Sequence, residues 1–501
     1  MEFSSPNLGQ DFRTDHLRST ILGGFIANMY EAMGWHVVRI NYLGDWGKHI
    51  GLLGIGWVRY GSEEVLENHA DPFRYLHEVY ARMEDELKPK LEAKKKRARD
   101  RAGQLEEDGN EDDEIFGERD ATFKKLEEGD TQAVELWEKL RRISIAYYVN
   151  VYRRIGVQFD DYPGESLVCR NPEAILAVEA RLRERDISDK APDGSWIIDF
   201  GKYDATRLGA VTIRSKDGTS TYFLRDLATV CDRMEDYNFS TLIYVVGEQD
   251  LHFRQVFKTI ELMGHVDIAE NLQHLAFTRG PSRWGKEQLL GDILDRCEEY
   301  MQRALAESSQ VPPQLRNLPP SAQRNLAINS LIVLELNNKN KAHTIGLDAE
   351  MLMSTEGETG LSLQLSYARL SSALEDLEDR QRKYLGSETK NGDSTPPEPD
   401  YLSLADNPWV ELPRLLVRYP ARVQAVYKSL EPSGLMSYLF QVLEEVCYCL
   451  DETGEGVNGI EDVGDSAAVA ARYAARILLF ECTKQVVLNA MRLLGIIPIN
   501  R

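Results

Sequence analysis

The chain has 501 residues, which is enough for two or three domains with buried cores. Its net charge of −22 excludes a general nucleic-acid coat, because non-specific binding to phosphates needs an excess of Lys and Arg, but a local basic face for one RNA stays possible. The six cysteines form no CxxC pair and no zinc spacing, which is typical of a reducing compartment. The sequence shows neither a secretion signal nor an apolar run long enough to span a membrane. We therefore expect a soluble cytoplasmic protein without a metal or a cofactor.

The first fifty residues have an α/β pattern. A short strand precedes Ser4, and an amphipathic helix is predicted from His16 to Met33, before Gly34. Its apolar residues recur at every fourth position: Leu17, Ile21, Phe25, Met29 and Met33. Residues 36–43 (HVVRINYL) are typical of a buried strand, and the GDWG turn follows at 44–47. A strand, a helix and a second strand, with a loop at the start of the helix, indicate the opening of a nucleotide-binding fold.

The middle of the chain alternates between charged and apolar segments. Residues 84–129 are rich in charge, which indicates a solvated helix and an acidic loop, or alternatively a partner-binding site. Helical periodicity returns at 136–152. Residues 209–221 predict a hairpin around Asp217 and Gly218, and 242–246 a short strand.

The last third is predicted to be helical. It follows a proline-rich break at 311–320 and is interrupted by a segment of linker composition at 386–400. We place an α/β domain at 1–300 with an insertion at about 60–160, a helical connector at 301–354 and a helical domain at 355–501.

Four motifs carry a resemblance to a known family. They are EFSSPN from Glu2, YFLRD from Tyr222, YVVGEQDLH from Tyr244 and MRLLG from Met491. In this order they resemble the eukaryotic type of arginyl-tRNA synthetase over nearly the whole chain. The resemblance implies a class I synthetase Rossmann-like catalytic domain with a helical insertion, followed by an all-α domain of the anticodon-binding type.

The resemblance also implies an arginine pocket. Glu2 and Asn7 would hold the backbone of the amino acid, while Tyr222, Asp226 and Gln249 would line its side-chain end. The chemistry fits, because one carboxylate can accept two parallel hydrogen bonds from a guanidinium. In the plainer interpretation Asp226 is an acid near a helix start and Tyr222 is a core aromatic.

The family's ATP signature is altered. Where the family has Phe-His-x-Gly-His, this chain has Arg13 and Asp15 in place of the first His and the Gly, followed by His16. The second ATP loop aligns to 280–285, where Trp284 is one of the changed residues. A carboxylate about 4 Å from a phosphate costs about 4 kcal/mol at an effective dielectric constant of about 20, which is roughly a thousandfold in affinity. We therefore expect ATP-dependent activation to be lost.

From these changes we predict a cyclodipeptide synthase, an aminoacyl transferase of secondary metabolism. Arginyl-tRNA and a second aminoacyl-tRNA would give an arginine-containing diketopiperazine, as in the fungal synthetase-derived enzymes that this chain also resembles. His16 or Asp15 would be the general base, with Ser5 a candidate for an acyl intermediate. Arg13 and Trp284 would line the pocket for the second amino acid.

On the helical domain the resemblance implies tRNA contacts by three residues: Arg369, Tyr438 and Met491. A monomer is favoured, although the sequence does not fix the oligomeric state. Two other functions stay open. A non-catalytic protein that binds tRNA or senses arginine would give no product from charged tRNA. A divergent but active arginyl-tRNA synthetase would exchange pyrophosphate into ATP.

Overall fold

The computed structural model describes residues 1–10, 12, 14–100, 114–216, 218–247, 249–277, 289–307, 318–337, 354–386, 397–452 and 466–499. The chain forms two compact units. The N-terminal unit comprises Met1–Gly23 and Val38–Leu290, and the C-terminal unit comprises Gly24–Val37 and Gly291–Arg501.

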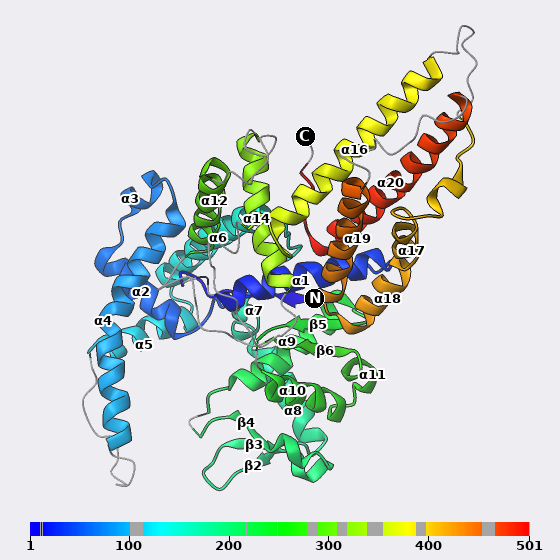
Figure 1. Cartoon of the computed structure of the whole chain (residues 1–501). Helices are drawn as coiled ribbons and strands as arrows, with labels where there is room; N and C mark the ends of the chain where they lie inside the picture. Colours follow the sequence, from blue (N-terminus) through cyan, green and yellow to red (C-terminus); the bar gives the residue numbers. More distant parts are fainter. Residues whose placement is uncertain are drawn as a thin grey trace. The chain divides into compact units, whose positions relative to one another are not determined.

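A parallel sheet lies at the centre of the N-terminal unit (Figure 1). Its order is β1 (Glu2–Phe3), β5 (Leu242–Val245) and β6 (Leu272–Leu275), and all four residues of β5 are buried. Helix α1 (Thr14–Ala32) follows β1. A Cβ on Gly23 of this helix would lie 2.2 Å from Cγ of Phe3, so only glycine allows this close packing of helix on strand. The predicted opening strand, helix and strand β5 are confirmed.

The predicted strand at 36–43 is wrong. This segment is extended, but it makes only isolated bridges, from Ile40 to Glu2 and Asp161 and from Leu43 to Gly164. On one side the Ile40 amide donates to Met1 O at 2.8 Å, and on the other the Leu43 amide donates to the carbonyl of Pro163 at 2.8 Å. A regular ladder cannot form at Pro163, because proline has no amide hydrogen to donate back to this segment.

A helical insertion follows the GDWG turn. Its helices are α2 (Lys48–Tyr60), α3 (Glu63–Asn68), α4 (Pro72–Asp100), α5 (Glu114–Glu127) and α6 (Thr131–Arg154). Asp130 caps α6 by accepting a hydrogen bond from the Ala133 amide at 3.0 Å. Apolar side chains of α2, α4, α5 and α6 share one buried cluster, and the helix predicted at 136–152 is confirmed.

A second core lies beside the parallel sheet. It is built by α7 (Glu165–Cys169), α8 (Pro172–Glu184), α9 (Tyr222–Tyr237), α10 (Asp250–Leu262), α11 (Val266–Ala269), and an antiparallel sheet of β2 (Asp189–Lys190), β3 (Trp196–Asp199) and β4 (Ala210–Arg214). Short 3₁₀ turns occupy Phe200–Tyr203 and Thr206–Leu208. The hairpin predicted at 209–221 is only partly present, because β4 pairs with β3 and its other edge makes one bridge, Arg214 to Ser220.

The regular elements that the structure describes in the C-terminal unit are all helices, as predicted. It contains α12 (Leu290–Glu307), α14 (Pro320–Leu336), α16 (Gly360–Gly386), a 3₁₀ turn (Tyr401–Leu404), α17 (Glu411–Val417), α18 (Tyr419–Ser429), α19 (Ser433–Glu452) and α20 (Ser466–Leu494). Helix α16 packs against α14, α19 and α20. Most of the predicted linker at 386–400 lies outside the described residues.

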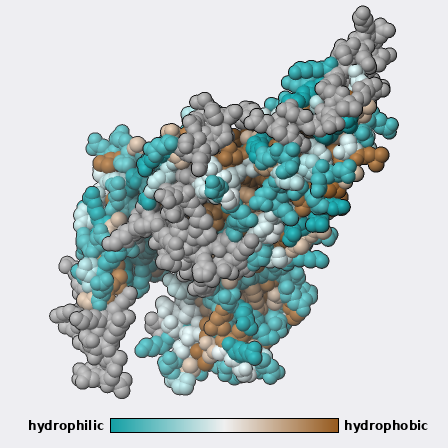
Figure 2. Space-filling view, in the orientation of Figure 1, coloured by the Kyte–Doolittle hydropathy of each residue, from teal (hydrophilic) through white to brown (hydrophobic). Residues whose placement is uncertain are grey.

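The surface shown in Figure 2 is mainly hydrophilic, with hydrophobic residues in small separate patches. None of the helices in the described part of the chain is long and apolar enough to cross a bilayer.

Candidate active site

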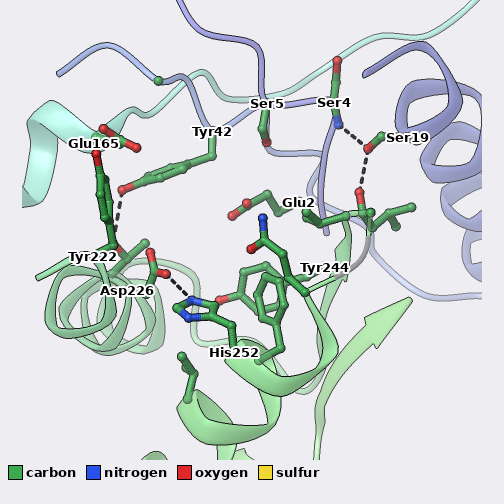
Figure 3. Close-up of a pocket in the computed structure, with 18 of the residues that line it drawn as sticks. Glu2, Ser4, Ser5, Ser19, Tyr42, Glu165, Tyr222, Asp226, Tyr244 and His252 are labelled. Carbon is green, nitrogen blue, oxygen red and sulfur yellow. Dashed lines mark hydrogen bonds and ion pairs between the residues drawn. The ribbon is translucent and has the colours of Figure 1, made fainter. Parts of the chain in front are cut away.

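A cavity of about 580 Å³ opens at the carboxyl ends of β1 and β5 in the N-terminal unit. Ligands of open α/β sheets bind at this edge, because the loops that leave the strands diverge there. Figure 3 shows Glu165, Tyr42, Tyr222 and Asp226 at one end of the cavity and Ser4, Ser5 and Ser19 at the other. We refer to these as the acidic end and the serine end.

The acidic end contains two carboxylates in contrasting settings. Asp226, in the second turn of α9, pairs with His252 of α10, and its Oδ2 lies 2.6 Å from Nε2 of the histidine. Burial, together with the negative charges of Asp226 and Asp45, raises the pKa of Glu165 to about 7 against the opposing effect of Arg225. In the described part of the chain, no group donates a hydrogen bond to the Glu165 carboxylate. The acidic end therefore suits a cation.

Glu165 was not singled out in the sequence. The signal that could have found it is the run Gly164, Glu165 and Ser166, which follows an extended segment ending at Pro163 and starts helix α7. Tyr222 and Asp226 lie at the same end of the cavity. The Tyr222 side chain is largely exposed, with the Arg225 guanidinium 5.3 Å from the centre of its ring.

Asp45 of the GDWG turn holds Glu165 in place. Its side chain is fully buried, and it accepts hydrogen bonds of 2.8 Å from the amide and from the hydroxyl of Ser166. Nε of Arg141 also lies 2.8 Å from Asp45 Oδ2. A Cβ on Gly164 would lie 2.2 Å from the same oxygen, so the close approach requires glycine. The turn that carries Glu165 is thereby fixed against the buried Asp45 carboxylate, which is paired with the partly exposed Arg141.

Glu2 already has a partner inside the protein. It is buried on β1, and its Oε2 lies 2.5 Å from Nη2 of Arg233 on α9. Burial raises the pKa of Glu2, and the Arg233 guanidinium opposes this shift. The guanidinium of Arg233 also lies 5.0 Å from the centre of the Tyr42 ring and 5.6 Å from that of Tyr244. The charge of Glu2 is thus balanced within the wall of the cavity.

At the serine end, the hydroxyls of Ser4 and Ser5 have different surroundings. Ser4 and Ser5 both have left-handed backbone conformations, with φ of 73° and 52°. The Ser4 hydroxyl is held by Tyr152, at 2.6 Å, and by the Thr20 hydroxyl, at 2.8 Å. The Ser5 hydroxyl is buried and has no hydrogen-bond partner among the described atoms, so it is the one available to a ligand.

The other predicted site residues that the structure describes in this unit also line the cavity. Asp15 stands in the first turn of α1, and His16 beside it is buried. Asn7 lines the cavity while its Nδ2 donates to Gln10 Oε1 at 2.9 Å. Gln249 lies at the exposed start of α10. The structure therefore brings together the predicted residues of the N-terminal unit that it describes.

Three further groups of predictions have other outcomes. Arg13 and Trp284, the predicted second pocket, lie outside the described residues. In the C-terminal unit, Arg369 is partly exposed and pairs with Asp451. Tyr438 and Met491 are buried instead, and the Tyr438 hydroxyl donates to Leu415 O at 3.0 Å, so in this structure both belong to the packing of the helices.

Comparisons with known proteins agree along the whole chain. The profile of the family described as tRNA synthetases class I (R), catalytic domain, matches residues 1–340, and that of the DALR anticodon binding domain matches residues 363–501. The cytoplasmic arginine–tRNA ligase of Saccharomyces cerevisiae is 33% identical over 510 residues, covering 100% of this chain and 76% of the relative. The mitochondrial ligase of the same yeast is 32% identical over 505 residues, covering 100% and 72%.

Solved structures share the fold. The arginyl-tRNA synthetase of Plasmodium falciparum superposes with a TM-score of 0.72 at 18% identity, covering 99% of this chain and 76% of that one. That of Thermus thermophilus gives 0.73 at 18%, covering 99% and 81%. The fold is therefore a class I synthetase catalytic domain followed by a helical DALR domain, as expected.

The predicted cyclodipeptide synthase is wrong. The relatives named above are arginine–tRNA ligases that match over the full chain. This overturns the diketopiperazine product, the aminoacyl-transferase class, a role in secondary metabolism, the second aminoacyl-tRNA partner and the expected loss of ATP-dependent activation. A few changed residues do not indicate a new reaction where the surrounding chain retains the likeness to the ligases. The relatives include cytoplasmic and mitochondrial enzymes, so the likeness favours neither compartment.

The catalytic-domain profile covers more than half of the sequence, and a relative 33% identical matches along all of it, so the chain belongs to the class I arginyl-tRNA synthetase family.

Proposed function

We propose that this protein is an arginine–tRNA ligase, which activates arginine with ATP and transfers it to tRNA. The observation that carries the proposal is the acidic end of the cavity, where Glu165 and Asp226 face a space of about 580 Å³ with the Tyr42 and Tyr222 side chains beside them. The names of the full-length relatives support the same activity.

Arginine fits the acidic end by its charge and shape. A guanidinium carries five N–H donors in one plane, and two carboxylates can accept them in pairs. Glu165 has no donor of its own among the described residues, so an incoming guanidinium would supply it, and the cation would favour loss of the Glu165 proton. Asp226 Oδ1 would accept a hydrogen bond from the guanidinium while Oδ2 stays paired with His252. Asn7 and the Ser5 hydroxyl lie toward the other end, for the backbone of the amino acid.

The ATP side is expected to be weakened. Asp15 places a carboxylate at the start of α1, where helix geometry otherwise favours phosphate. At about 4 Å this repulsion is worth about 4 kcal/mol at an effective dielectric constant of about 20. We therefore expect a high KM for ATP, and Asp15→Gly should lower it by at least tenfold.

The test is arginine-dependent exchange of pyrophosphate into ATP, measured with and without tRNA. Exchange by the wild-type chain, which is stronger in Asp15→Gly and lost in Glu165→Gln, would support the ligase. Glu173→Gln is the matched control, because Glu173 is an exposed glutamate in the first turn of α8. Absence of exchange in both the wild type and Asp15→Gly would contradict the ligase.

A second candidate is favoured by Asp15 itself, namely an arginine-binding protein that does not adenylate. It shares the acidic end with the ligase and differs only at the ATP side. Calorimetry separates the two, because arginine binding without exchange would assign the second function.

Binding of the tRNA anticodon is attributed to the C-terminal unit on its likeness to the DALR anticodon binding domain. Of the three residues predicted to contact tRNA, Arg369 is the one that is partly exposed. We expect Arg369→Ala to raise the KM for tRNA and to leave pyrophosphate exchange without tRNA unchanged.

A further inference from the structure

A second cavity of about 770 Å³ lies behind the acidic end, also within the N-terminal unit. Three residues line both cavities: Tyr42, Thr229 and Arg233. They therefore form the partition between the two spaces. The far side of this partition is lined by other residues, among them Trp137 and Tyr237, which do not reach the first cavity.

The Tyr42 ring is fixed from two sides. Its hydroxyl lies 3.2 Å from the Thr229 hydroxyl, and the Arg233 guanidinium lies 5.0 Å from the centre of its ring. Thr229 donates its only hydroxyl hydrogen to Arg225 O at 2.9 Å, so Tyr42 must be the donor to Thr229. Burial raises the pKa of Tyr42 well above its usual range, which keeps this donor hydrogen in place.

The partition lies next to the position expected for the guanidinium of a bound arginine. Thr229 lies three residues after Asp226, so both side chains project from the same face of α9. Figure 3 shows Tyr42 at the same end of the cavity as Asp226, beside Glu165. A guanidinium held by Glu165 and Asp226 would thus have the Tyr42 ring directly beyond it.

We propose that Tyr42 is a specificity-determining residue, whose ring, held by Thr229, sets the maximum length of the side chain that the cavity accepts. This inference rests on the proposed function, since it takes arginine as the ligand of the acidic end. The side chain of arginine is short enough to end before the Tyr42 ring. An alkyl group on the guanidinium would clash with the ring. Removal of the ring joins the two cavities and gives the alkyl group the space behind it.

The test compares the Kd of L-arginine with that of Nω-propyl-L-arginine, by calorimetry on the full chain. The wild type should bind the propyl compound at least tenfold more weakly than arginine. Tyr42→Ala and Tyr42→Leu should each reduce this ratio at least tenfold, and the leucine variant keeps an apolar side chain against Arg233 should the alanine variant fail to fold. Tyr42→Phe keeps the ring and loses only the hydrogen bond, so its ratio should fall by less than threefold.

Tyr237→Ala is the matched control, because Tyr237 lines only the second cavity, where its hydroxyl bonds Asp161. It enlarges the space behind the partition without opening it, and its ratio should equal that of the wild type. The inference is overturned if Tyr42→Ala or Tyr42→Leu binds arginine and keeps the wild-type ratio, or if the wild type binds both compounds equally. A wild type that binds no arginine overturns the proposed function instead, and the inference with it.

Discussion

Replacement of Glu165 by glutamine should make the protein more stable at alkaline pH and less able to bind arginine. Glutamine has nearly the same shape as glutamate and carries no charge. In the wild type, burial and the neighbouring carboxylates of Asp226 and Asp45 raise the pKa of Glu165 to about 7. Ionisation of this side chain therefore opposes folding, and it is the ionised form that a guanidinium requires.

The magnitude follows from linkage between protonation and folding. The pKa of Glu165 is about 7 in the folded chain and 4.5 is its ordinary value, so the native state holds the proton more tightly. The stability that this provides is fully present below pH 4.5 and is lost as the pH rises through about 7. At about 1.4 kcal/mol per pH unit the loss is about 3 kcal/mol. The difference in free energy of unfolding between Glu165→Gln and the wild type should thus grow by about 3 kcal/mol from pH 4.5 to pH 8.

Arginine binding should depend on pH in the opposite sense. At pH 6 only about a tenth of Glu165 would be ionised in the free protein, so arginine should bind about tenfold more weakly than at pH 8. Glu165→Gln should bind it weakly at both values. Calorimetry in two buffers of different ionisation enthalpy would also detect the proton released when arginine binds.

Denaturant unfolding at pH 4.5 and pH 8 provides the stability measurement. Glu173→Gln, an exposed replacement in α8, is the control and should change the free energy of unfolding by less than about 0.5 kcal/mol. The reasoning is refuted if Glu165→Gln shows the same stability difference from the wild type at both pH values. It is also refuted if wild-type affinity for arginine is constant between pH 6 and pH 8.

Three further replacements test the acidic end. Asp226→Asn should weaken arginine binding at least tenfold in calorimetry, because the amide turns a donor toward the guanidinium and deprives His252 of its carboxylate; unchanged affinity would remove Asp226 from the site. Asp45→Asn should lower the free energy of unfolding by about 3 kcal/mol, since it leaves Arg141 without its buried partner, and an unaltered denaturation midpoint would contradict this. Gly164→Ala should cost about 1–3 kcal/mol in the same assay, because its Cβ would lie 2.2 Å from Asp45 Oδ2, and a neutral effect would show that the turn can relax.

Local patterns in the sequence determined much of the fold. Apolar residues at every fourth position predicted helix α1, and Leu17, Ile21, Phe25 and Met29 are all buried. The apolar run at 242–246 predicted β5, and the helical periodicity of the last third of the chain predicted its helices. These elements were readable because each depends on the spacing of apolar side chains along one segment, which a sequence records directly.

The strand expected at 36–43 failed because a strand depends on its neighbours. Its apolar residues were sufficient for an extended segment. Regular pairing with the neighbouring segments that the structure describes is absent, and the segment on one side contains Pro163, which has no amide hydrogen to donate. The same holds for the hairpin at 209–221, since β4 found its main partner in β3.

The site was decided mainly by tertiary structure. Motif likeness selected Glu2 and Asp226, but only the fold shows that Glu2 is balanced by Arg233 and that Asp226 shares its end of the cavity with Glu165. Glu165 lies 61 positions before Asp226 in the chain, so no local pattern joins them. Its raised pKa arises from burial and from charges that folding brings close, and neither is a property of any segment taken alone.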